Sequence, residues 1–167
     1  MRWLWIDRII DHEPNQRLVA TKHVSLEEEY LNDYNIDGRV VMPASLLIEG
    51  MAQTAGILVG TTSRFKEKVI LAKIARATFD SDVTAGDTVR FVASIEKLDG
   101  AGAATSGTLD RRVAGGEAWE RIGRIELIFS HIDNNMAGIK FPEHNFVFSD
   151  NFRKILETAG LADLIES

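Results

Sequence analysis

The stretch from residue 33 to residue 60, DYNIDGRVVMPASLLIEGMAQTAGILVG, contains a long apolar run that constrains what the chain can fold into. Residues 46–59 are apolar on nearly every side of a helix, and a helix of that kind is buried rather than lying on a surface. Pro43 suits the first helical turn, and Gly60 with Ser63 marks the far end. The rest of the chain must therefore cover this helix on most of its sides.

One face of this predicted helix is different from the others. Ser45, Glu49 and Gln53 follow each other at intervals of four residues, so they project from the same side. Gly56 and Gly60 continue that face without side chains. The stripe predicts an internal groove in which a ligand approaches the helix backbone closely.

Glu49 has three possible explanations. A membrane-spanning helix has about the right length, but Glu49 and Gln53 near its centre are costly in hydrocarbon. A plain core helix is the second explanation, with Glu49 reaching solvent or pairing with an arginine. In the third, Glu49 lies in an apolar pocket and is poised for proton transfer. The last two alternatives stay open on the helix residues alone.

The segments around the helix change from helical to alternating periodicity. A strand is predicted in RLVATKHVSL, which follows a turn at Pro14 and Asn15, whereas Asp37-Gly38 indicates a turn and not a hairpin. Four strand-like runs follow the helix: KVILAKIARATF, DTVRFVASIEKL, AATSGTLDRRV and EAWERIGRIELIFSHI. One buried helix with an antiparallel meander predicts an α+β fold in which the sheet covers the helix.

The pattern of apolar and polar residues predicts two parts. Residues 1–132 form the main domain, and residues 133–167 form a C-terminal extension. The extension contains a short amphipathic helix, with Ser149 or Asp150 as N-cap and Gly160 as C-cap. The apolar stripe of that helix consists of Phe152, Ile155, Leu156 and Ala159. We expect this stripe to cover something, either the mouth of the groove or a partner subunit.

Composition excludes several functional classes. With 19 basic and 25 acidic residues the net charge is -6, which argues against a nucleic-acid partner. The chain has no cysteine, so disulfides, thiolate zinc sites and thiol nucleophiles are excluded. The N-terminal residues lack a secretory signal, so we expect a cytoplasmic protein. We also expect neither a metal nor another cofactor.

The run MPASLLIEGMAQTAGIL resembles the helix of the beta-hydroxyacyl-(acyl carrier protein) dehydratases of fatty-acid synthesis, whose motif contains E-A-M-A-Q after a Gly- and Pro-rich loop. IDRIIDHEPNQRLVATKHVS is similar to the opening segment of that FabZ/FabA-like family, and FDSDVTAGDTVRF to a later strand. The resemblance covers roughly residues 4–131. It implies a hot-dog fold, a long central helix wrapped by a curved antiparallel sheet, in a dimer or trimer of dimers with active sites at the subunit interface.

The resemblance also implies roles for individual residues. Glu49 corresponds to the carboxylic acid that protonates the departing β-hydroxyl, and the backbone N–H of Ala44 would polarise the thioester carbonyl. Asn35 stands where the family has its catalytic histidine. The candidate substrate-binding residues are Ala44, Ser45, Gln53 and Tyr34. An asparagine side chain cannot take up a proton near neutral pH, so Glu49 is the surviving member of the catalytic pair.

Three functions follow from this departure. The chain could be a dehydratase of acyl carrier protein or CoA thioesters in which Glu49 acts alone, through water, or with another histidine. His23 is nearest by family position, and His12, His131 and His144 lie farther from the motif. It could instead be an acyl-thioesterase in which Glu49 activates water or attacks the thioester. Thirdly, it could be a non-catalytic subunit that binds acyl chains or a carrier protein.

Overall fold

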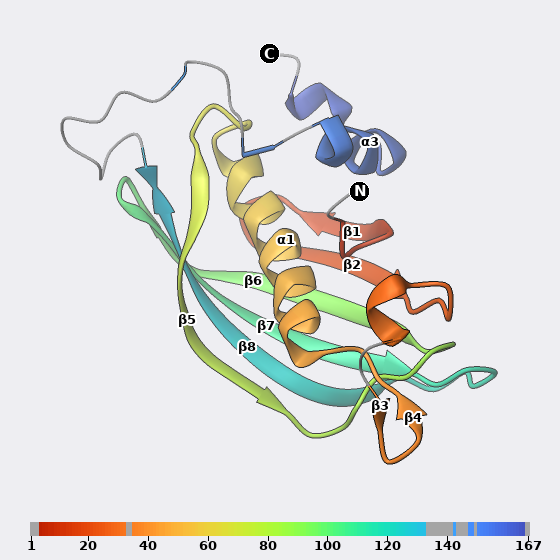
Figure 1. Ribbon diagram of the computed structural model, residues 1–167. Coiled ribbons are helices and arrows are strands. Elements are labelled where there is room, and N and C mark those ends of the chain that lie inside the picture. Colours follow the sequence, from red (N-terminus) through yellow and green to blue (C-terminus); the bar gives the residue numbers. More distant parts are fainter. Residues whose placement is uncertain (1–3, 33–34, 133–141, 143–146, 149, 166–167) are drawn as a thin grey trace.

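The computed structural model of the chain describes residues 4–32, 35–132, 142, 147–148 and 150–165. Six antiparallel strands form one curved sheet in the order β1-β2-β6-β7-β8-β5, and this sheet wraps around the long helix α1 (Figure 1). The strands are β1 (Arg8–Glu13), β2 (Arg17–His23), β5 (Val69–Phe79), β6 (Thr88–Asp99), β7 (Gly102–Arg112) and β8 (Glu120–His131). The predicted α+β hot-dog fold is confirmed.

The helix α1 (Ala44–Thr62) packs closely on the concave face of the sheet. Two glycines permit this approach. A Cβ atom on Gly50 would overlap the Phe91 ring on β6, and one on Gly107 of β7 would overlap the side chain of Met51. Helix and sheet therefore bury one shared core, to which β6 contributes Phe91 and α1 contributes Met51.

The ends of α1 differ slightly from those expected. Pro43 is the N-cap, directly before the first helical residue, and Ser63 is the C-cap. Gly60 lies inside the last turn, where its carbonyl oxygen accepts a hydrogen bond from the Phe65 N–H at 2.8 Å. Within the part of the chain that the structure describes, neither α1 nor any other helix is long and apolar enough to cross a membrane.

A small hairpin precedes α1. Its strands are β3 (Asn35–Ile36) and β4 (Arg39–Val40), joined by Asp37 and Gly38. Both joining residues have positive φ, 51° and 77°, as a two-residue turn of type I′ requires. The prediction that Asp37-Gly38 is a turn without a hairpin is therefore wrong. The hairpin lies near the N-terminal end of α1 (Figure 1).

The C-terminal part of the described chain contains the helix α3 (Asp150–Thr158) and a short 3₁₀ turn, η2 (Ala162–Leu164). A second 3₁₀ turn, η1 (Glu29–Asn32), follows β2. Gly160 ends α3 with φ of 71°, and the Leu161 N–H bonds to the Leu156 carbonyl as in a Schellman motif. Leu156 is fully buried in the common core, and α3 contacts β1. The stripe of α3 thus covers the body of its own chain.

Candidate functional site

Glu49 is half-buried on α1, and its carboxylate is held by a neighbouring amide. The Gln53 Nε2 donates a hydrogen bond to the Glu49 Oε1 at 2.9 Å, as the spacing of four residues allows. The Gln53 Oε1 in turn accepts a hydrogen bond from the backbone N–H of Trp5 at 2.8 Å. Because its oxygen is engaged by Trp5, the amide must present its NH₂ group to Glu49. The N-terminal segment therefore fixes the orientation of the amide that holds the carboxylate.

Glu49 and Gln53 line a pocket of about 370 Å³ beside α1. The other lining residues are Ala52, Gly56, Val69, Ile70, Leu71, Phe129, Val147, Phe148 and Phe152. Every one of these is apolar, so among the described residues that line the pocket only Glu49 and Gln53 have polar side chains. The predicted groove along α1 exists from Glu49 to Gly56, and β5, β8 and the C-terminal segment form its other walls.

The start of α1 offers uncapped backbone donors. Pro43 makes no side-chain capping bond, and the first turn contains no acidic residue. Ala44 and Ser45 are exposed there, so Ser45 belongs to the helix start and not to the pocket lining. A helix N-terminus with accessible N–H groups stabilises negative charge, including the charge that develops on a carbonyl oxygen. Such charge stabilisation is the chemistry expected of Ala44.

The structure places the backbone of Asn35 in β3, while its side chain and the whole of Tyr34 lie outside the described residues. The hairpin that carries Asn35 is joined to α1 through the short segment from Val41 to Pro43. The roles given to Asn35 and Tyr34 by the resemblance stay predictions.

The histidines of the chain are His12, His23, His131 and His144. His23 is exposed at the end of β2, where its Nδ1 lies 3.3 Å from the Thr88 Oγ1. His131 is buried on β8, 2.8 Å from the Glu67 carboxylate. Burial lowers the pKa of His12, against the opposing effect of Asp11. None of these three lines the pocket of Glu49, and His144 lies outside the described residues.

Sequence reasoning missed part of the pocket wall. Phe152 was expected on the stripe of the C-terminal helix, but Val147 and Phe148 precede that helix and carry no periodic signal. The sequence also does not predict the hydrogen bond from the Trp5 backbone N–H to Gln53, because every residue except proline has this donor. Both contacts join segments that are distant in the chain.

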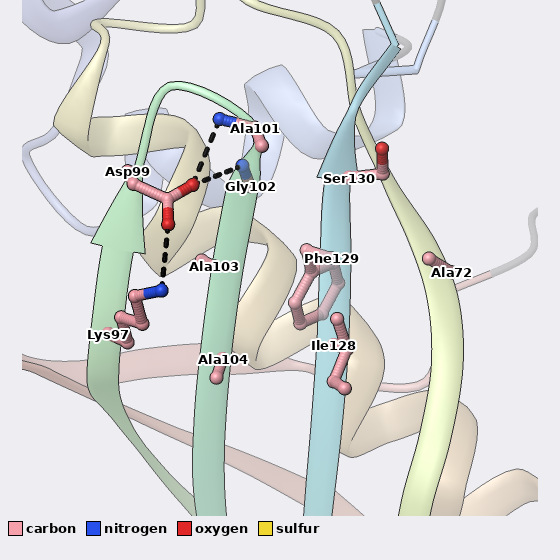
Figure 2. Close-up of a pocket in the computed structure, with 10 residues that line it drawn as sticks. All are labelled: Ala72, Lys97, Asp99, Ala101, Gly102, Ala103, Ala104, Ile128, Phe129 and Ser130. Carbon is pink, nitrogen blue, oxygen red and sulfur yellow. Dashed lines mark hydrogen bonds and ion pairs between the residues drawn. The ribbon is translucent and has the colours of Figure 1, made fainter. Parts of the chain in front are cut away.

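A second hollow of about 380 Å³ lies over the ends of β6, β7 and β8 beside β5 (Figure 2). Its charged residues are Lys97 and Asp99, which form an ion pair at 3.1 Å. Figure 2 also shows the N–H groups of Ala101 and Gly102 bonded to the Asp99 carboxylate, at 3.0 and 3.2 Å. Asp99 therefore stabilises the turn between β6 and β7. The pocket that Glu49 lines is the better candidate for a site of acid–base chemistry.

Comparison with known proteins identifies relatives in both sequence and structure. The family model of the FabA-like domain matches residues 1–117. The 3-hydroxyacyl-(acyl-carrier-protein) dehydratase FabZ of Enterococcus faecalis is 32% identical over 124 residues, covering 72% of this chain and 85% of its own. FabZ of Staphylococcus carnosus is 36% identical over 99 residues, covering 59% and 68% respectively.

Solved structures with the same fold include two kinds of protein. The dehydratase heterocomplex ApeI:P of Xenorhabdus doucetiae has a TM-score of 0.58 at 14% identity, covering 79% of this chain and 85% of that one. An acyl-CoA hydrolase of Staphylococcus aureus, in complex with butyryl coenzyme A, has a TM-score of 0.58 at 13% identity, covering 88% and 84%. At these identities the likeness shows the fold alone.

Proposed function

Because the chain belongs to the FabA-like family, we propose that it is a 3-hydroxyacyl-thioester dehydratase, a lyase that acts on acyl groups carried by acyl carrier protein or CoA. The observation that carries this proposal is the carboxylate of Glu49, held by Gln53 at an apolar pocket on the central helix. The pocket suits an acyl chain, and the carboxylate supplies a proton-transfer group beside it.

The reaction requires two proton movements. The α-proton leaves the carbon next to the thioester carbonyl, and the β-hydroxyl departs as water after gaining a proton. Asn35 cannot serve as the base, so Glu49 does both tasks. Its carboxylate takes the α-proton, directly or through water, and the resulting carboxylic acid returns a proton to the departing hydroxyl. The products are an enoyl thioester and water, and Glu49 is regenerated as a carboxylate.

Two further groups support the elimination. The amide of Gln53 orients the carboxylate, since it is itself fixed by the Trp5 N–H. The uncapped N–H of Ala44 stabilises the negative charge that grows on the thioester oxygen as the α-proton leaves. Because the family histidine is replaced, we expect a rate about 10²- to 10⁴-fold below that of a site with a paired base.

The same pocket suggests that the active unit is a homodimer. Residues 69–71 of β5 form one wall of the pocket, and β5 is the last strand of the sheet. A long edge strand with exposed Leu71 and Ile74 is a surface that native proteins pair or cover. A second copy of the chain, paired along β5, would protect this edge and enclose the pocket, in agreement with the assembly that the resemblance implies.

Hydrolysis of the thioester is the second candidate function. The replacement of the family histidine by Asn35 favours it, because a carboxylate that activates water suffices for hydrolysis. Incubation of the purified protein with 3-hydroxyacyl thioesters of acyl carrier protein and of CoA separates the candidates when enoyl product and free thiol are followed together. Enoyl product is the expected result. Free thiol alone would identify a thioesterase, and binding without either product would identify a non-catalytic subunit.

A further inference from the structure

The pocket of Glu49 has a polar end and an apolar end. Glu49 and Gln53 mark the polar end, and Gly56 lies about 10 Å from Glu49 along α1, at about 1.5 Å per residue. A glycine at this point leaves open space, since a Cβ atom on Gly56 would make only an ordinary contact of 3.5 Å with Phe129. An acyl chain whose thioester lies near Glu49 can therefore extend along α1 as far as Gly56.

Beyond Gly56 the same face of α1 is covered by aromatic rings. A Cβ atom on Gly60 would lie 2.8 Å from the Cζ of Phe148 and 2.7 Å from the Cε1 of Phe65, so both rings rest directly on the helix backbone. The rings of Phe65 and Phe148 meet edge to face, with centroids 4.7 Å apart. Phe148 and Phe152 meet in the same way, at 5.9 Å. These rings cover the continuation of the groove one helical turn after Gly56.

The aromatic rings are anchored by the C-terminal helix of the same chain. Phe152 belongs to α3, whose Ile155 and Leu156 are 6% and 0% exposed within the common core. Figure 1 shows α3 beside the C-terminal end of α1. Phe148 and Phe152 both lie outside residues 1–117, the part of the chain that the family model matches. This end of the pocket is therefore built by a segment that the matched family region does not supply.

We propose that Phe148 and Phe152 close the distal end of the pocket and set the upper length of the acyl chain that it accepts. The proposal rests on the proposed function in one respect, because it takes the pocket to be the acyl-chain site. Its physical basis is packing. An acyl chain that reaches past Gly56 must displace Phe148 from Gly60, and the edge-to-face contact of Phe148 with Phe65 is then lost. Removal of the Phe148 ring would open the groove towards Gly60.

The test compares Phe148→Ala and Gly56→Ala with the wild-type protein. The first variant lengthens the space, and the second narrows it by one methyl group at a position that has room for it. The matched control is Phe79→Ala, which also removes a phenyl ring, at a partly buried core residue of β5 that neither belongs to α3 nor lines the pocket. Two readouts are taken: binding of S-alkyl pantetheine thioethers of increasing alkyl length, which cannot react, and turnover of 3-hydroxyacyl thioesters of the same lengths.

We expect Phe148→Ala to raise the ratio of long-chain to short-chain binding, and of turnover where it occurs, by about tenfold or more, the discrimination that a methylene gives in a fitted apolar pocket. Gly56→Ala should shift the optimum to shorter chains, and Phe79→Ala should leave it in place. An unchanged length profile in both pocket variants, an equal shift in Phe79→Ala, or no binding of any alkyl chain would overturn the proposal. A shift in binding without any turnover would uphold it and would refute the dehydratase function separately.

Discussion

The side-chain amide of Gln53 is held by two hydrogen-bond partners, and together they explain why a glutamine stands at this position. Gln53 is 6% exposed, and each end of its amide has a different partner: the Trp5 N–H at the oxygen and the Glu49 carboxylate at the nitrogen. A glutamate at position 53 would lack the donor, and an apolar residue would lack both groups. We therefore propose that Gln53 positions Glu49, a role that is separable from binding of the acyl chain.

Replacement of Gln53 by methionine, which keeps the volume of the side chain, tests this role. We expect kcat to fall about 10- to 100-fold, because a hydrogen bond to a charged group contributes about 1.5–3 kcal/mol. KM should change little, since the apolar walls of the pocket are retained. Steady-state kinetics on a 3-hydroxyacyl thioester measures both constants. Gln16→Met, at an exposed turn, is the control, and an unchanged kcat in Gln53→Met would contradict the positioning role.

At the scale of elements, the sequence predicts the helices and strands that are long enough to show a periodic pattern of apolar residues. The four runs after the helix correspond to β5, β6, β7 and β8. Burial alternates along much of β6, β7 and β8, as the alternating sequence predicts, whereas most of β5 is exposed. The hairpin at Asp37-Gly38 was not predicted, since strands of two residues contain no alternation. The wall made by Val147 and Phe148 could not be predicted either, because it depends on where the C-terminal segment meets α1. Glu49 and Gln53 were found because helical spacing aligns them.

Three strands are joined by a buried carboxylate on the sheet. Asp110 of β7 is 4% exposed and bonds with Arg90 of β6 at 2.8 Å and with Arg121 of β8 at 2.5 Å. The Trp119 ring lies over Arg90, with the guanidinium 4.4 Å from the ring centroid. Burial acts to raise the pKa of Asp110, but the bonds from Arg121 and Arg90 outweigh it and hold that pKa below its usual value of 3.8. The folded state thus favours the charged form of this residue.

Asp110→Asn should therefore destabilise the protein in a pH-dependent manner. We expect a loss of about 1–3 kcal/mol at neutral pH, because the two arginines lose a charged acceptor but remain partly exposed to solvent. A carboxyl whose pKa is lowered by folding stabilises above its unfolded pKa, and this contribution disappears as pH falls through its folded pKa. The difference between variant and wild type should narrow below about pH 4.

Urea denaturation at neutral and acidic pH measures this difference. Asp80→Asn serves as the control, since Asp80 is exposed. If Asp110→Asn lost the same stability at both pH values, the negative charge of Asp110 would not be the source of its stabilising effect.

At the scale of the whole molecule, the open edge of the sheet and the pocket lie together. Ile74 on β5 is 45% exposed, and Leu71 of the same strand is part of the pocket wall. A dimer formed along β5 would therefore bury the edge and complete the pocket in one step. Such a dimer would make assembly and activity depend on the same residues.

Ile74→Arg should weaken this assembly, because a charged side chain at an edge strand opposes pairing. We expect light scattering to give the mass of a dimer or larger oligomer for the wild type and a shift towards the monomer for the variant, with a parallel loss of turnover. Ile128→Arg, at a similarly exposed isoleucine on β8, is the control. A wild-type protein that is monomeric at working concentrations, or a fully active monomeric variant, would refute the dimer.

The central claim is that Glu49 carries the chemistry, and the most direct test is the rate of enoyl formation by Glu49→Gln relative to wild type. Glu126→Gln, which removes an exposed carboxylate on β8, is the matched control. The account predicts a loss of about 10²-fold or more in kcat for Glu49→Gln, since no other described residue of the pocket can transfer a proton, and full activity for Glu126→Gln. Undiminished turnover by Glu49→Gln would contradict the account.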